Sequence, residues 1–446
     1  MKKVLIFFCT FVFVKAGLFS QTISLEQVRV LALANSRGLA KVNLSLRSSA
    51  LDEKSQLYSM LPGISAGYSA SMDYLNKDWD FINPVDSFRA GLNLEITQTL
   101  FNGGRSLINR AISKIATESV RKEAIAEYFN TLDSADNAYY AVLEAAATLE
   151  AEESSLQTAL SSLSIAEIRR SSGMINPGDF LKALADRESR ENSRNQAKRN
   201  LSLSLLKLKS ITGLDEIPAP EVIDFSGYND LIQYLGTIPD HDADALYDRF
   251  WKITAAANPS LARSALNRQT AVKRLSIARR EYIPSISASL FSTSLNYSVA
   301  DGFKTSSGGG VTLKGSIPLD FWVMSNKVEK SKIALESASI DYINAENQLE
   351  MDLQSALIKT LDQSGSLLSS RRALEYAEKH FEYVMERYRL SLGSIADLTE
   401  ASTMLINNRN SYIRSQYGFL QSLSKLRSLG AIDDEERLVN ILMGNT

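Results

Sequence analysis

Alternating apolar and polar residues mark two short segments in each half of the chain. From Ile64 to Tyr74 and from Phe88 to Thr97, apolar side chains occupy every second position, with small or polar ones between them. The alternation returns from Ile286 to Leu290 and from Val311 to Leu319, with a change of face near Phe291 that predicts a bulge. A period of two is typical of a strand with one apolar and one wet face. We predict four strands in two hairpins, at about residues 63–75, 88–101, 285–298 and 309–320.

Longer segments follow a helical period. Residues 105–172 contain neither glycine nor proline, and residues 324–390 contain only Gly365. At 1.5 Å per residue, either segment would form a helix of about 100 Å. Both end in apolar residues spaced by three and four positions, which predicts a coiled-coil seam. We predict long helices at about residues 104–172 and 324–390, each followed after a turn by a shorter return helix, at about 180–212 and 397–430.

The two halves of the chain repeat one another. LPGISAG at residues 61–67 corresponds to IPSISAS at 283–289, and each proline stops a helix where a strand begins. SSGMINPGDFLKA at 171–183 aligns with RLSLGSIADLTEA at 389–401, which places Asp397 218 positions after Asp179. The expected fold is α+β, a duplicated helix-strand-strand-helix-helix unit. Its first repeat spans residues 21–213, an irregular linker spans 214–244, and the second repeat spans 245–446.

Composition excludes several classes of function. The chain has 49 basic and 51 acidic residues, a balance that gives no nucleic-acid surface. Its two histidines lie far apart, its single cysteine is Cys9, and Gly308–Gly310 lacks the Lys-Ser/Thr of a phosphate-binding loop. No nucleophile-elbow GxSxG occurs. We therefore expect no enzyme activity, no cofactor and no metal site.

The N-terminus predicts export. Lys2 and Lys3, an apolar run and small residues up to Ser20 are typical of a signal peptide at residues 1–20. Beyond it no apolar run is long enough for a membrane-spanning helix, whereas the alternating segments fit membrane strands. Four strands cannot close a barrel, and an open sheet edge is untenable in hydrocarbon. If the strands cross a membrane, several chains must share one barrel.

These features together resemble the TolC-like outer membrane efflux protein family, the outer membrane factors. The resemblance rests on the helix-to-strand junctions at Pro62 and Pro284, the strand-to-helix exit LFNGG at 100–104 and the turn RYRLSLGSIADLTEA at 387–401. It implies a homotrimer in the outer membrane, with a 12-stranded β-barrel continued through the periplasm by a barrel of long coiled-coil helices. It also implies a periplasmic adaptor protein and an inner-membrane pump or ABC secretion transporter as partners.

The resemblance also assigns candidate site residues. It implies a pore constriction or gate at Asp397, Glu400, Asp179 and Tyr388, while Gly393 stands where some members have a latch arginine. It implies an adaptor-docking site at two turns, Ser172, Gly173, Met174 and Leu390, Ser391, Leu392. A helix cap fits Asp179 about as well as gating does, and Gly173 also fits a helix stop, whereas for the pair Asp397 and Glu400 we favour the pore over caps. The alternation predicts lipid-facing side chains on the strands, among them Tyr68, Leu92, Leu94, Val311 and Leu313.

Two functions follow from this pattern. The first is an outer-membrane exit duct of a tripartite efflux or type I secretion system, and its substrate is not encoded in these features. The alternative is a periplasmic or surface coiled-coil scaffold with a soluble β-hairpin head. A scaffold gains nothing from strands with one nearly continuous apolar face, so the alternation favours the duct.

Overall fold

The structure is a computed structural model that describes residues 22–72, 80–81, 88–298, 302–304 and 308–444. The predicted signal peptide, residues 1–20, lies outside the described residues. The chain divides into two compact units. The helical unit contains residues up to Leu39, Ala126–Asn258 and those from Gln348 onward, and the sheet unit contains Ala40–Ile125 and Pro259–Asn347.

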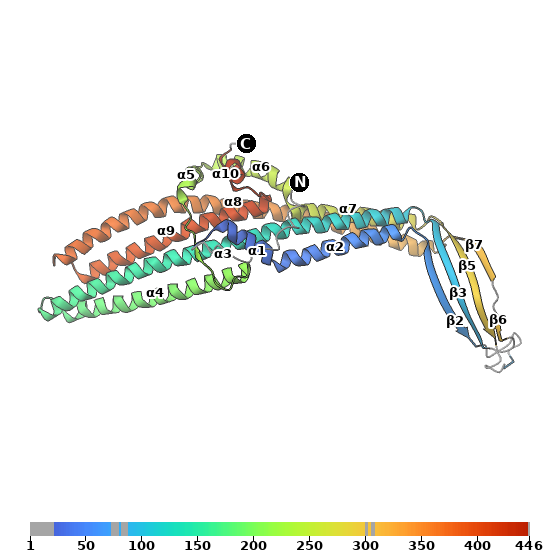
Figure 1. Cartoon of the computed structure of the whole chain (residues 1–446). Coiled ribbons are helices and arrows are strands. Elements are labelled where there is room, and N and C mark those ends of the chain that lie inside the picture. The colour runs from blue at the N-terminus through green and yellow to red at the C-terminus, as the bar shows by residue number, and fades with distance from the viewer. Residues whose placement is uncertain (1–21, 73–79, 82–87, 299–301, 305–307, 445–446) are drawn as a thin grey trace. The chain divides into compact units, whose positions relative to one another are not determined.

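Both repeats have the same order of elements (Figure 1). The first contains α2 (Arg37–Tyr58), β2 (Gly63–Ser71), β3 (Arg89–Phe101), α3 (Arg105–Ser171) and α4 (Pro177–Thr212). The second contains α7 (Pro259–Arg280), β5 (Ser285–Ser298), β7 (Gly308–Ser316), α8 (Phe321–Arg389) and α9 (Ile395–Gly430), with the short strand β6 (Gly302–Lys304) between β5 and β7. Within the described residues, no helix has the length and apolar character needed to span a bilayer.

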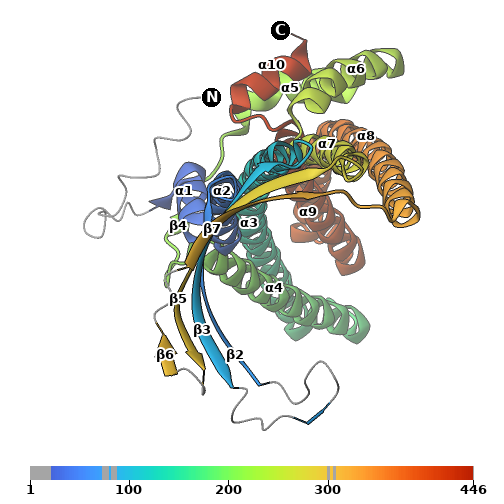
Figure 2. The same cartoon turned by 90° about the vertical axis from the view of Figure 1, so that its right-hand side faces the viewer.

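The sheet unit carries one antiparallel sheet in the order β2-β3-β5-β7, with β6 also paired to β5 (Figure 2). The two predicted hairpins are thus joined through β3 and β5. The register shifts where Leu92 pairs with Leu295 and Asn93 with Thr293, so the extra residue of β5 is Ser294. The predicted bulge near Phe291 is therefore displaced by three residues. The Phe291 ring lies over Gly310 of the neighbouring strand, and a Cβ at Gly310 would lie 2.9 Å from that ring. Because the glycine leaves room for the ring, Phe291 fits on the polar face without a bulge at its own position.

The core of the helical unit lies where α3, α4, α8 and α9 meet the shorter helices. These are α1 (Leu25–Asn35), α5 (Asn229–Thr237), α6 (Asp240–Ala257) and α10 (Glu435–Met443). Tyr139, Phe250, Leu353 and Phe419 are among its fully buried side chains. Tyr139 donates its hydroxyl to the carbonyls of Ile23 (3.1 Å) and Glu221 (2.7 Å). It thereby joins the segments of the short parallel strands β1 (Thr22–Ile23) and β4 (Ala219–Pro220).

Residues 214–244, predicted to be an irregular linker, contain ordered structure. Besides β4, they form the 3-10 helix η1 (Phe225–Tyr228), α5 and the start of α6. The α5 residues Leu231, Ile232 and Leu235 are buried in the core. Their helical spacing covers too few residues to stand out beside the surrounding prolines and glycines, which is why the sequence suggested a loop.

Candidate functional site

The turns that join the long and return helices are built alike in the two repeats. At the end of α3, Met174 N donates to Arg169 O (2.8 Å) and Gly173 N donates to Arg170 O (3.0 Å). At the end of α8, Leu392 N donates to Arg387 O (2.8 Å) and Ser391 N donates to Tyr388 O (3.0 Å). Both are Schellman motifs, in which one residue takes a left-handed conformation. That residue is Gly173 (φ 69°) in the first turn and Ser391 (φ 64°) in the second.

The six residues predicted to dock an adaptor lie at these two turns. Ser172, Gly173 and Met174 are exposed, as are Leu390, Ser391 and Leu392. Met174, Leu390 and Leu392 keep 76%, 62% and 66% of their surface accessible, so each turn presents an apolar side chain that packs poorly within this chain. A Cβ at Gly173 meets nothing within 4 Å. A larger side chain there therefore projects outward, although its backbone conformation would be strained.

A small core lies directly behind the turns. We call it the turn-end cluster; its buried residues come from all four long helices and are Ala166, Ala183, Val384, Met385, Tyr388, Ile395, Leu398 and Ala401. Tyr388 is the largest and is 1% exposed. Burial raises the pKa of its hydroxyl, the positive charge of Arg169 opposes that shift, and the negative charge of Asp179 adds to it. Two of the predicted gate residues, Tyr388 and Asp179, thus lie near one another.

The predicted acidic gate residues also serve as first-turn residues of their helices. Asn176 caps α4 by accepting from the backbone nitrogens of Gly178 (2.5 Å) and Asp179 (3.2 Å). Ser394 caps α9, where the Asp397 nitrogen donates to its hydroxyl (3.1 Å) and its own nitrogen donates to the Asp397 carboxylate (3.3 Å). This is a capping box, which stabilises the helix start. The capping alternative therefore holds for Asp397, whose carboxylate is nonetheless exposed, as is that of Glu400.

The five predicted lipid-facing side chains lie on one face of the sheet. Residues directly opposite in an antiparallel pair share a face, and Tyr68 pairs with Leu92, Ala66 with Leu94, Leu290 with Val311 and Ala288 with Leu313. Leu290 also pairs with Ile96, which follows Leu92 and Leu94 on the same face of β3. All five are exposed in the single chain: Tyr68, Leu92, Leu94, Val311 and Leu313. Their contact with lipid stays a prediction.

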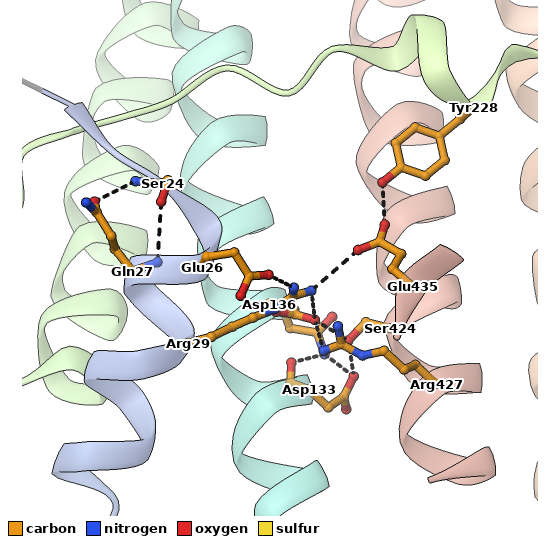
Figure 3. A network of polar contacts seen from close by, with 11 residues as sticks. Ser24, Glu26, Gln27, Arg29, Asp133, Asp136, Tyr228, Ser424, Arg427 and Glu435 are labelled. Carbon is orange, nitrogen blue, oxygen red and sulfur yellow. Dashed lines mark hydrogen bonds and ion pairs between the residues drawn. The ribbon is translucent and has the colours of Figure 1, made fainter. Parts of the chain in front are cut away.

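A buried charged network in the helical unit was not predicted (Figure 3). Asp136 of α3, fully buried, accepts from Arg29 Nε of α1 (2.6 Å) and from Arg427 Nη2 of α9 (2.6 Å). Ser424 donates to both Asp136 (3.0 Å) and Asp133 (2.9 Å). Burial lowers the pKa of Arg29, but the hydrogen bond and charge of Asp136 outweigh it and leave that pKa above its ordinary value. These contacts hold α1, α3 and α9 together.

Little in the sequence points to this network. Arg29 and Asp136 stand on helices with no charge pattern that links them, and the partners are 107 and 291 positions apart. The usable signal is the charge itself: Asp136 interrupts a run of residues that are buried on the same helix, among them Ala135, Ala138 and Tyr139. A carboxylate at such a position requires a partner of opposite charge.

Several solved structures have the same fold as this chain. Among solved structures, the outer membrane channel CmeC of Campylobacter jejuni is 16% identical with a TM-score of 0.77, over 94% of this chain and 89% of that one. The outer membrane protein VceC of Vibrio cholerae is 16% identical with a TM-score of 0.74, over 91% and 96%. CusC, whose structures concern transmembrane channel formation, is 15% identical with a TM-score of 0.77, over 94% and 95%. At such identities the likeness shows the fold, and it confirms the predicted α+β fold.

The family follows from the sequence profile. The outer membrane efflux protein family matches residues 28–214 and 252–431, and the chain belongs to that family. No protein with a curated description matches it in sequence. The predicted resemblance is thereby confirmed, and the two matched segments begin and end near the bounds of the two structural repeats.

Proposed function

We propose that this chain is the outer-membrane exit duct of a tripartite efflux or type I secretion system. The observation that carries the proposal is the sheet: one face is apolar and exposed, and both edges are open. Within the described residues, β2 pairs only with β3 and β7 only with β5. Unpaired backbone groups cost several kcal/mol each in hydrocarbon. A membrane sheet of this kind is stable only if its edges pair with those of other copies.

Three copies provide the closure that the family resemblance implies. Each contributes β2, β3, β5 and β7, and the edge of β7 in one copy pairs with β2 of the next. In this arrangement the exposed apolar face contacts lipid and the face that carries Ser69, Asn93 and Thr312 lines the lumen. The helical unit lies in the periplasm, where the two turns meet an adaptor protein. The pump joined to that adaptor selects the substrate.

Fractionation tests the duct against a scaffold. A duct appears in the outer-membrane fraction as a heat-modifiable trimer, and the purified trimer conducts ions in a planar bilayer. A soluble monomer that conducts nothing would support the alternative, a periplasmic or surface scaffold with a β-hairpin head, and would overturn the proposal.

A substitution on the sheet sharpens the test. Leu94→Arg places a charge on the proposed lipid face near the middle of β3 and should destabilise the barrel by about 2–4 kcal/mol. Asn93→Arg is the matched control, because the adjacent residue lies on the opposite, polar face and its side chain would enter water. Trimer yield in the membrane should fall for Leu94→Arg and stay near wild type for Asn93→Arg. Equal yields for the two variants would contradict the assignment of the faces.

A further inference from the structure

Polar contacts join the two helical hairpins of the helical unit at several levels. The first hairpin is α3–α4 and the second is α8–α9. Farthest from the turns, Asp136 binds Arg427, as described above. Closer to them, Asn410 Nδ2 donates to Glu152 Oε1 (2.9 Å) and Arg190 Nη2 donates to Thr403 Oγ1 (2.6 Å). At the turns themselves, the contact is made by Arg169 of α3 and Tyr388 of α8.

Arg169 makes two contacts with the last turn of α8. Its guanidinium lies 4.3 Å from the centre of the Tyr388 ring, and its Nη2 donates a hydrogen bond to the Tyr388 carbonyl. That carbonyl also accepts from Ser391 in the Schellman motif, so Arg169 binds the very group around which the turn is built. A cation at the C-terminus of a helix is further stabilised by the helix dipole. Three separate interactions therefore favour the same position of this side chain.

We propose that Arg169 is the positioning residue that holds the second hairpin against the first at the turns and so limits the opening of the channel there. The last clause rests on the proposed function; the first does not. Gly393, next to the second turn, has no side chain with which to bind the first hairpin. Arg169, which belongs to the first hairpin, makes the contact with the second hairpin instead.

The ring of Tyr388, rather than its hydroxyl, is the partner in this contact. The hydroxyl is buried and makes no hydrogen bond within the described structure, whereas the ring is covered by Arg169 on one side and packs in the turn-end cluster. Tyr388→Phe should therefore preserve the contact. Tyr388→Leu keeps an apolar side chain but removes the aromatic face that the cation requires.

Arg170 provides a matched control. It is the next residue of α3, carries the same charge and stacks at the same distance, 4.3 Å, but on Phe180 of α4, within its own hairpin. Removing Arg170 deletes a cation–π contact of the same length without touching the second hairpin. The pair Arg169→Ala and Arg170→Ala therefore separates contact between the hairpins from stacking in general.

Hydrogen–deuterium exchange measures the contact directly. In Arg169→Ala, amides of residues 385–400 should exchange roughly three- to thirtyfold faster, the range that loss of one cation–π contact allows. Arg169→Lys should fall between wild type and alanine, because it keeps the charge and loses the planar guanidinium. Arg170→Ala should accelerate exchange near residues 176–184 and leave 385–400 unchanged. Unchanged exchange at 385–400 in Arg169→Ala, or an equal change in Arg170→Ala, would overturn the proposal.

Conductance then tests the effect on the channel. Arg169→Ala trimers should conduct more than wild type, while Arg170→Ala trimers should match it. Faster exchange without higher conductance would refute the claim that this contact limits opening. A wild-type protein that forms no membrane trimer would refute the proposed function instead, and the exchange result would still decide whether Arg169 holds the two hairpins together.

Discussion

Removal of the Asp136 side chain should strongly lower the stability of the helical unit. Its carboxylate is fully buried and accepts hydrogen bonds from Arg29, Arg427 and Ser424. Asp136→Ala leaves both guanidinium groups without this partner. Arg29 retains Glu26 and, at 3.8 Å, Glu435, so the larger share of the loss falls on Arg427.

The loss of unfolding free energy can be worked out from the charge that stays unpaired at Arg427. Breaking a buried ion pair on one side costs about 3–5 kcal/mol, because the other charge stays buried and uncompensated. For a unit of this size such a loss lowers the unfolding midpoint by about 10 °C. Asp136→Asn keeps the shape and one acceptor but loses the charge, so we expect about 2–3 kcal/mol, the value of a hydrogen bond to a charged group.

Thermal and urea unfolding, followed by the helical circular dichroism signal, measures these losses. Asp133→Ala is the matched control: it stands one turn earlier on α3, is half-buried and binds Ser424 but neither arginine. Its loss should stay near 1 kcal/mol. A loss for Asp136→Ala within about 1 kcal/mol of this control would refute the reasoning. Replacing Arg29, Asp136 and Arg427 together by Met, Leu and Met should recover much of the stability, since no buried charge then remains.

Three further predictions concern other parts of the molecule. Burial, with a smaller contribution from the negative charge of Glu221, raises the pKa of Tyr139 from 10.0 to about 12. The neutral hydroxyl therefore stabilises the fold at pH values below 10, and this contribution to folding stability is lost as the pH rises through 12. Tyr139→Phe should lower stability by about 1–2 kcal/mol at neutral pH and flatten this alkaline decline; an unchanged slope would contradict the assignment. Asp397→Ala combined with Glu400→Ala should reduce cation selectivity and block by multivalent cations in bilayer recordings, because three-fold acidic rings concentrate cations; if both properties persist, Asp397 is only a cap. Gly173→Trp should abolish export and leave trimers intact, and normal export would remove the docking role of that turn.

The sequence predicts the elements of this fold much better than their pairing. The long helices lack glycine and proline and carry clear heptads, so their type and approximate ends follow from local pattern alone. Pairing between β3 and β5 joins residues such as Ile96 and Leu290, nearly two hundred positions apart, and no local signal specifies it. The bulge at Ser294 was displaced in the prediction because Phe291 reads as a change of face, whereas its ring simply covers a glycine on the partner strand.

In the candidate site, too, local features could be predicted from the sequence and contacts between distant segments could not. Helix caps and turn residues are set by neighbours within five positions, so the sequence alone located both turns and the first-turn aspartates. Contacts between hairpins depend on which helix faces meet. At the offset of 218, Arg170 and Tyr388 take equivalent positions at the ends of the two predicted coiled-coil seams, yet Tyr388 is buried and Arg170 is exposed. Arg169, one residue away from the seam, makes the contact between hairpins, and periodicity does not reveal it.

The duplication is retained in backbone conformation more faithfully than in side chains. At the offset of 218, the left-handed cap residue of the turn is Gly173 in one repeat and Ser391 in the other, and that of the return helix is Gly213 (φ 73°) and Ala431 (φ 49°). Gly430 is the last helical residue of the second return helix and Ala431 makes the cap, with Ile432 N bonded to Arg427 O (3.0 Å). A left-handed alanine or serine costs about 1 kcal/mol more than glycine. The cap hydrogen bonds at Ser391 and Ala431 are nevertheless formed, because the packing of the return helix fixes where the chain must turn. Tertiary contacts thus maintain the left-handed caps of the second repeat. In the first repeat, glycine adopts the same conformation without strain.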